Sequence, residues 1–382
     1  MAFEHYIRSG QKMLRCGYTT GTCAALAAAG AARLLLTGRR PASLCLRTPK
    51  GWPVEVEPDA LELEGGEARC AVRKDAGDDP DVTDGMLVWA SVRLTGAPGV
   101  LIDGGEGVGR VTKPGLDQPV GAAAINRVPR QMIAEAVQTE LDAAGWGGGA
   151  EVTVSIPGGA ERAGRTFNPL LGIEGGLSVL GTSGVVEPMS EEAIVATIEV
   201  ELRQAAHASP WGRLILTPGN YGADYLAARG LDRLGVPVVR CSNFIGEALD
   251  IAAAERFRQV LLVGHIGKLV KLAGGIMNTH SRMADCRTEL FCAHAAAAGA
   301  SAGLCRALLA APTTDACVEL LDREKLRAPV LASLTEAAQS HIERRAAGAF
   351  RAGVALFSNT YGLLGESDAA RSLIAEWRKD GT

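Results

Sequence analysis

Aromatic side chains are scarce in this chain, since Phe, Trp and Tyr make up only 4% of its 382 residues. Proteins that bind single-stranded nucleic acid stack bases on such rings, so the scarcity disfavours that class. The formal net charge of -4 offers no basic surface to a phosphate backbone either. We therefore predict no nucleic-acid partner. Apolar residues make up 47% and charged residues 21%, which is typical of a folded protein, and the length suffices for two domains.

Long hydrophobic runs are missing as well. The longest stretch of small apolar residues, 294–312, is alanine-rich, contains Arg306 and is too short and too polar to span a bilayer. Residues 1–15 mix both charges and do not resemble a signal peptide. We expect a cytoplasmic protein without a membrane partner.

The nine cysteines form no CxxC pair, and no cluster of cysteine and histidine has the spacing of a zinc site. Several lie inside alanine-rich or leucine-rich runs, where a free thiol behaves as a small apolar side chain. We therefore expect reduced, mostly buried thiols and no metal site belonging to the protein.

The sequence does contain four short apolar runs that each end in a polar, glycine-bearing turn. They occupy 213–217, 236–240, 261–263 and 354–357, and helical patterns follow the first three. Strands that alternate with helices form parallel sheets with right-handed crossovers, so the four turns should lie together at the carboxyl edge of one sheet. Ligands of open α/β sheets bind at that edge.

Small and polar residues in these turns are candidates for binding a cofactor. Glycine permits close approach of the backbone to a ligand. Asparagine can bond either to the turn backbone or to a polar ligand, and the sequence leaves both roles open. The candidate cofactor-binding residues are Gly219, Asn220, Tyr221, Gly222, Asn243, Gly246, Gly264 and Gly267. We expect the third strand to break at Gly264 and a helix to begin near Ile266.

The first half of the chain has a different order, in which a helix precedes several strands. Thr19-Thr20-Gly21-Thr22 opens an alanine-rich helix over 23–36, and Gly38 closes it. Strand patterns occupy 43–48, 54–57, 61–73, 86–94 and 151–156, with a helix predicted over 129–143. We therefore predict an α+β domain over residues 1–187 and a second, parallel α/β domain over 188–382.

Two polar loops in the first half are further candidates. Loop 74–85 carries five aspartates, which either bind a cation, position a base or form an ordinary solvated turn. Loop 104–115 is rich in glycine and carries Arg110 and Lys113, two possible partners for anions.

Taken together, these segments resemble the CbiD family, the cobalt-precorrin-5B C1-methyltransferases of anaerobic cobalamin biosynthesis. The resemblance covers nearly the whole chain, and the combination of strings is specific. The matching strings are GYTTGTCA at 17–24, DAGDDPDVT at 75–83, GEGVG at 105–109, PGNYG at 218–222, CSNFIG at 241–246, GHIGK at 264–268, NTHSR at 278–282 and SN at 358–359.

The resemblance implies that S-adenosyl-L-methionine donates a methyl group to carbon 1 of cobalt-precorrin-5B, a cobalt-containing tetrapyrrole, to give cobalt-precorrin-6A. Cobalt then belongs to the substrate. For the first domain the resemblance implies a fold similar to domain 2 of ribosomal protein S5. We expect a Rossmann-like parallel α/β sheet in the second domain. Transient contacts with neighbouring pathway enzymes are a further expectation.

Methyl transfer from a sulfonium requires the acceptor carbon to be held about 3 Å from the methyl group, with water excluded. A base is needed only if a ring N–H proton is removed, and His265 and His280 are the first candidates, followed by Asp78 or Asp79. Cationic groups are expected to bind the carboxylates of the tetrapyrrole. The candidate substrate-binding residues are Thr19, Thr20, Arg110, Lys113, Lys268 and Arg282.

Two alternatives remain open at this point. The chain could bind and hand over corrinoid intermediates without catalysing a reaction. It could also be a dehydrogenase whose second domain holds a dinucleotide, although no Gly-x-Gly-x-x-Gly string follows any of the four predicted strands.

Overall fold

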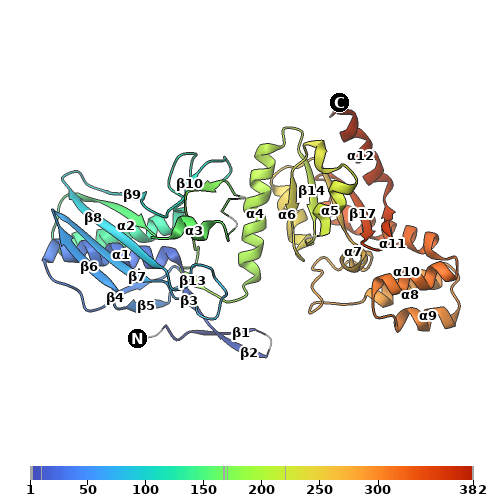
Figure 1. The fold of residues 1–382 in the computed structure, drawn as a ribbon, viewed down its shortest axis with the longest axis horizontal. Helices are drawn as coiled ribbons and strands as arrows, with labels where there is room; N and C mark the ends of the chain where they lie inside the picture. Colours follow the sequence, from blue (N-terminus) through green and yellow to red (C-terminus); the bar gives the residue numbers. More distant parts are fainter. Residues whose placement is uncertain (1–2, 10, 167, 170, 220, 381–382) are drawn as a thin grey trace. The chain divides into compact units, whose positions relative to one another are not determined.

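The computed structural model describes residues 3–9, 11–166, 168–169, 171–219 and 221–380 (Figure 1). The chain divides into two compact units, Met1–Glu191 and Glu192–Thr382. Each unit mixes helices with strands, so the protein has a two-domain mixed α/β fold.

The first unit contains most of the strands of the chain. Its elements are β1 (Tyr6–Ser9), β2 (Lys12–Arg15), β3 (Gly17–Tyr18), α1 (Thr20–Thr37), β4 (Leu44–Arg47), β5 (Pro53–Val56), β6 (Ala60–Glu64), β7 (Glu67–Arg73), β8 (Leu87–Thr95), β9 (Val100–Gly104), β10 (Arg110–Val111), α2 (Arg127–Ala143), β11 (Gly149–Ser155), α3 (Gly159–Ala163), β12 (Ile173–Glu174) and β13 (Val185–Val186).

A five-stranded sheet with the order β6-β7-β8-β11-β9 forms the centre of the first unit, and only the β11–β9 pair is parallel. Along β8, Val88, Ala90 and Val92 are buried and their neighbours are more exposed. This period of two turns one face of the sheet toward α1 and α2, which supply much of the core. The helices lie on that face in Figure 1. Pairs β1–β2, β3–β13, β4–β5 and β10–β12 form small separate sheets.

Helix α1 is the most apolar segment of the first unit. By length and composition it could cross a membrane, but 72% of the relevant window is buried inside the structure. It begins at Thr20, three residues earlier than predicted, because the Thr19 hydroxyl accepts the N–H of Thr22 at 3.2 Å. Gly38 ends the helix in the left-handed conformation, as predicted. Burial of α1 against the sheet shows that it serves as the core helix of this unit.

The single strand predicted over 61–73 is wrong. The structure has two strands, β6 and β7, joined by Gly65 and Gly66, whose φ angles are +57° and +82°. Two successive positive φ angles are the signature of a type I′ hairpin turn. The Gly65-Gly66 pair between Glu64 and Glu67 is the local sequence signal for this turn, and the prediction of one strand overlooked it. Pro49, Lys50 and Gly51 lie in the connection between β4 and β5, which pair antiparallel.

The second unit has more helix than the first. Its elements are α4 (Glu191–Ala208), β14 (Arg213–Thr217), α5 (Tyr221–Ala228), η1 (Asp232–Leu234), β15 (Val238–Arg240), α6 (Ile245–Ala254), β16 (Gln259–His265), α7 (Ile266–Leu269), η2 (Val270–Gly274), α8 (Arg287–Ala297), α9 (Ala302–Leu309), α10 (Thr314–Arg323), α11 (Arg327–Ala346), β17 (Arg351–Ser358), β18 (Gly362–Glu366) and α12 (Asp368–Asp380).

The sheet of the second unit has the order β15-β14-β16-β17-β18. The first four strands are parallel, which confirms the prediction from the four apolar runs, and β18 adds an antiparallel edge strand that the sequence did not indicate. Alternate residues enter two cores. Leu262 and Val354 face the core that contains α11, whereas Leu261 and Ala355 face the core that contains α12. Helices therefore cover both faces of this sheet.

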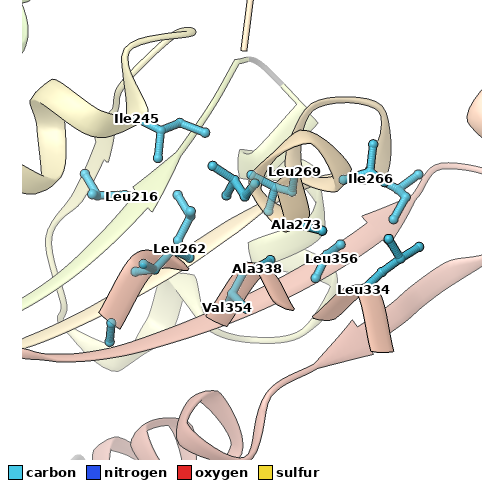
Figure 2. Close-up of a cluster of buried hydrophobic side chains, with 14 of the residues drawn as sticks. Leu216, Ile245, Leu262, Ile266, Leu269, Ala273, Leu334, Ala338, Val354 and Leu356 are labelled. Carbon is cyan, nitrogen blue, oxygen red and sulfur yellow. The ribbon is translucent and has the colours of Figure 1, made fainter. Parts of the chain in front are cut away.

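Figure 2 shows the larger of these cores beneath the carboxyl edge of the sheet. Ile266, Leu269 and Ala273 come from α7 and η2, and they meet Leu334 and Ala338 of α11 over strands β16 and β17. All five side chains are buried. The segment that follows β16 is therefore anchored by its apolar side, while the Lys268 side chain stays only half-buried.

Candidate functional site

Four turns meet at the carboxyl edge of the second sheet, as the sequence predicts. They follow β14, β15, β16 and β17, which are adjacent and parallel. Gly219 follows the first strand and Ser242 the second, while His265 and Ser358 end the third and fourth. Asn220, also predicted to bind a cofactor, lies outside the described residues. This edge is the candidate site, and we call it the carboxyl-edge cluster.

Lys268 connects three of these turns. Its side chain leaves α7 and its Nζ donates a long hydrogen bond of 3.4 Å to the carbonyl oxygen of Ser242. A Cβ built on Gly219, whose φ is +95°, would lie 3.4 Å from the same Nζ. The side chain is half-buried, and burial lowers the pKa of Lys268 below its ordinary value. The ammonium is thus held among backbone turns with weak hydrogen bonding.

His265 lies at the centre of the edge and caps α7. Its Nδ1 accepts the N–H of Gly267 at 3.1 Å. In the neutral ring this bond places the proton on Nε2, so the second nitrogen is a donor. Burial lowers the pKa of His265, although Asp315 partly opposes the shift, so the ring is neutral near pH 7. Tyr221 and Phe357 lie beside it, with ring centroids 6.2 Å and 5.8 Å away.

Asp315, in the first turn of α10, is a member of the cluster that sequence reasoning missed. Its carboxylate accepts hydrogen bonds from Ser358 Oγ at 2.9 Å and from Thr360 Oγ1 at 2.8 Å. Within the described parts of the chain no cation pairs with it. The sequence signal was only that of a helix start, since Asp315 follows the N-cap Thr313, and the contact with β17 spans more than forty residues of sequence.

Asn243 and His280 belong to a neighbouring loop whose polar groups bond to one another. Asn243 accepts hydrogen bonds from Thr279 through both its backbone and its side-chain oxygen. His280 Nδ1 accepts the N–H of Arg282 at 3.1 Å, the same arrangement as at His265. Both candidate bases therefore use their lone pair for the backbone and present Nε2–H in the neutral form. Arg282 itself is exposed, and no acid among the described residues pairs with its guanidinium.

Three of the predicted cofactor glycines are packing positions. A Cβ on Gly264 would lie 2.7 Å from Pro218 Cγ, one on Gly222 would lie 2.6 Å from Thr217 Cβ, and one on Gly246 would lie 2.8 Å from Arg345 Cζ. These glycines let chain segments approach one another. The strand break predicted at Gly264 is also wrong, because β16 continues through it and pairs with β17 up to His265.

In the first unit, every aspartate of loop 74–85 has partners of its own. Asp75 accepts both terminal guanidinium nitrogens of Arg15 at 2.6 Å and 2.8 Å, and Asp81 forms an ion pair with buried Lys74. The carboxylates of Asp78, Asp79 and Asp84 accept the backbone N–H groups of Arg15, Met189 and Ala76. In the part of the chain that the structure describes, no group of three or more His, Cys, Asp or Glu residues could hold a metal ion.

The other substrate candidates of the first unit differ in availability. Thr19 and Thr20 are buried at the start of α1, 6% and 7% exposed. Arg110 forms a two-pronged ion pair with Asp103, at 2.7 Å and 3.0 Å. Lys113 is exposed and packs its methylene groups over Gly172, where a Cβ would lie 2.5 Å from Lys113 Cγ. Of the two cations among these candidates, Lys113 therefore has the more accessible charge.

Comparisons with known proteins give a consistent result. Residues 7–188 match the family model CbiD, and residues 278–368 match the model CbiD, C-terminal domain. The cobalt-precorrin-5B C(1)-methyltransferase of Ruminiclostridium cellulolyticum is 44% identical, over 93% of this chain and 92% of the relative. The enzyme of the same name from Alkaliphilus metalliredigens is 40% identical, over 99% of both chains.

A third relative of that name, from Moorella thermoacetica, is 43% identical over 96% of this chain and 99% of its own. Among solved structures, the cobalamin biosynthesis protein CbiD of Archaeoglobus fulgidus is 29% identical, with a TM-score of 0.39, and covers 74% of this chain and 87% of that one.

Proposed function

The chain belongs to the CbiD family, and we propose that it catalyses methylation of carbon 1 of cobalt-precorrin-5B to give cobalt-precorrin-6A in anaerobic cobalamin biosynthesis. The observation that carries this function is the identity of 40–44% with enzymes of that name over at least 92% of both chains. A methyltransferase needs a methyl donor, and the tetrapyrrole with its cobalt is the substrate.

S-adenosyl-L-methionine is the donor in this proposal. It has a carboxylate, an ammonium and ribose hydroxyls, and the carboxyl-edge cluster supplies groups that can recognise each. Lys268 offers a cation, Asp315 an acceptor and His265 a donor. The place of these groups also supports the proposal, because open α/β sheets bind ligands at this edge.

Methyl transfer forms a bond between the ring carbon and the methyl group as the S–CH₃ bond breaks, and its electron pair stays on sulfur. The electron-rich macrocycle supplies the attacking pair. The protein accelerates such a step chiefly by alignment and exclusion of water. To accept a proton from the macrocycle, the imidazole of His265 or His280 must first give up the hydrogen bond that its Nδ1 accepts from a backbone N–H. Both histidines are therefore better arranged as donors. Asp78 and Asp79 are the remaining candidate bases, and one oxygen of each already accepts a backbone N–H, from Arg15 at 2.7 Å and from Met189 at 3.2 Å.

The side-chain carboxylates of the tetrapyrrole require cations, and Arg282 and Lys113 have the most accessible charges of the predicted set. Arg110 could bind substrate only by exchanging Asp103 for a substrate carboxylate. Thr19 and Thr20 are proposed to shape the site through the start of α1 because they are buried there.

We further propose that the first domain has a fold similar to domain 2 of ribosomal protein S5 and that the second is Rossmann-like. Support comes from the sheet with helices on one face in the first unit and from the parallel sheet covered on both faces in the second. The proposed boundary near Glu187 lies just before α4. A cytoplasmic location and transient contacts with neighbouring pathway enzymes complete the proposal.

One assay tests the function directly. The purified chain, methyl-labelled S-adenosylmethionine and cobalt-precorrin-5B should give S-adenosylhomocysteine and a labelled methyl group on carbon 1, located by NMR. A carrier would bind the tetrapyrrole without consuming the donor. A dehydrogenase would bind a nicotinamide dinucleotide in calorimetry and not S-adenosylhomocysteine. Either result would overturn the proposal.

A further inference from the structure

Lys268 is a half-buried cation whose hydrogen-bonding capacity is largely unused. An ammonium has three donors, whereas within the part of the chain that the structure describes Lys268 makes one bond, of 3.4 Å, to Ser242 O. Among the described residues no carboxylate forms an ion pair with it. Lys271, one turn along the chain, makes bonds of 3.0 Å and 2.8 Å to the carbonyl oxygens of Thr279 and Ala284 and lies 3.8 Å from Asp285. The contrast between the two lysines singles out Lys268, because a partly desolvated charge without a partner is costly.

The surroundings of Lys268 determine what kind of anion can reach it. Its Nζ lies against Gly219 and Ser242, both of which have positive φ, +95° and +51°. The groups next to the ammonium are thus turn backbone, and the Lys268 side chain is half-buried at the strand ends. A carboxylate at the end of a slender chain reaches such a half-buried cation more readily than the edge of a large macrocycle does, whose carboxylates can meet exposed cations such as Arg282.

From this geometry we infer that Lys268 binds the carboxylate of the methionine part of S-adenosylmethionine, so that the amino-acid end of the donor lies over β14 and β15. This assignment rests on the proposed function, since it presupposes that methyl donor. It moves Lys268 from the substrate set to the cofactor set. The nucleoside end of the donor then extends across β16 toward Asp315, beyond the end of β17.

Two ligands that differ at the amino-acid end test the assignment. S-adenosylhomocysteine has the carboxylate, and 5′-methylthioadenosine has the same nucleoside without an amino-acid group. In calorimetry with the full chain, Lys268→Met should weaken S-adenosylhomocysteine binding about 10- to 100-fold, the range of a hydrogen bond to a charged group. Binding of 5′-methylthioadenosine should change less than about twofold, because the lost bond is not made to it.

Three controls separate this effect from damage to the protein. Lys325→Met removes an exposed charge after α10 and should leave both affinities unchanged. Lys268→Arg keeps the charge and should recover part of the preference for S-adenosylhomocysteine. Lys268→Gln is the second neutral variant should Lys268→Met not fold. The melting temperature of each variant shows whether the fold is intact.

The outcomes are distinct. Equal weakening of both ligands, or of neither, overturns the assignment. A raised KM for the tetrapyrrole with unchanged S-adenosylhomocysteine affinity also overturns it and returns Lys268 to the substrate. If the wild-type chain binds no S-adenosylhomocysteine at all, the proposed methyl donor fails and the assignment fails with it.

Discussion

Loop 74–85 of the first unit and the carboxyl-edge cluster of the second are both polar, and the sequence marks both as functional candidates. The structure separates them by how far their polar groups are already satisfied. In the loop, each of the five aspartates accepts at least one hydrogen bond from the first unit itself. In the edge cluster, Lys268 makes one long bond to the residues that the structure describes, and none of their cations pairs with Asp315. Saturated polar groups maintain a fold, whereas unsatisfied ones can bind a ligand.

This difference has energetic consequences that mutations can expose. Removing a polar group from the loop leaves its partner without compensation inside the same unit, so stability should fall. Removing an unsatisfied polar group from the edge cluster deprives the ligand, rather than the protein, of a hydrogen-bond partner. Ligand binding should therefore fall while the stability of the protein changes little. Each of the following predictions tests one side of that contrast.

The largest effect should come from Lys74, whose side chain is 2% exposed and paired with Asp81. Lys74→Met should lower the free energy of unfolding by about 3 kcal/mol, because it leaves a partly buried carboxylate without its cation. Chemical denaturation measures the loss. Asp81→Asn in the Lys74→Met background should recover part of it. S-adenosylhomocysteine affinity should not change at temperatures where the variant remains folded, and a specific loss of affinity would place the loop in the binding site.

The second prediction concerns Gly264, which the sequence marked as a point of ligand approach. Because Pro218 and Leu269 occupy the space beside it, Gly264→Val should destabilise the protein by about 2 kcal/mol through overpacking. Gly303→Ala, at an exposed position of α9, is the control, since the new Cβ would meet Ser301 Oγ at an ordinary contact distance of 3.6 Å, and it should not destabilise. A Gly264→Val variant with normal stability and weak ligand binding would contradict overpacking and support Gly264 as a point of ligand approach.

The two interpretations of Gly264, as a point of ligand approach and as a packing position, show what the sequence could and could not predict. Apolar runs and the helical patterns between them are local signals. They predict that strands β14 to β17 are parallel, and this prediction is confirmed. The space beside Gly264 is set by Pro218, in the turn that follows β14, and the bond from Ser358 to Asp315 joins β17 to a helix far away in sequence. Such contacts depend on tertiary packing, for which a single sequence has no periodic signal. The location of the candidate site was therefore predictable, but its hydrogen bonds were not.

The third prediction returns to the loop and uses pH. Burial alone would raise the pKa of Asp75, but hydrogen bonds from Arg15 and Gly77 outweigh it and lower the pKa. A carboxyl whose pKa is lower in the folded state stabilises the protein above its unfolded pKa, about 3.9, and loses this contribution as the pH falls through the folded value.

Asp75→Asn should therefore cost about 1 kcal/mol near pH 7, a moderate value because the pair is partly exposed. The difference in melting temperature between wild type and variant should shrink below about pH 4. Asp232→Asn, on the exposed η1 turn, is the control and should melt like the wild type at every pH. A difference that persists in acid would mean that the Arg15 pair is not its source.

An effect on stability as small as that of Asp75→Asn, and the sharpest test of the edge cluster, is expected at His265. Its two nitrogens have different tasks, since Nδ1 caps α7 and Nε2–H faces away from that bond. His265→Ala should cost about 1 kcal/mol, the usual value of a lost cap. His265→Asn should restore stability, because Asn Oδ1 occupies the place of Nδ1, while it lacks the Nε2–H donor.

Activity of the same variants then distinguishes the roles of His265. If the ring only caps the helix, His265→Asn should have normal kcat and KM. If Nε2–H contacts a ligand, His265→Asn should be stable and bind that ligand more weakly, and His265→Gln, whose amide reaches the position of Nε2, should recover binding without recovering stability. If the ring is a base, all three variants should lose about 10²–10⁴-fold in kcat whatever their stability. The bond from Gly267 to Nδ1 favours the second pattern, because a base needs a lone pair that this contact already occupies.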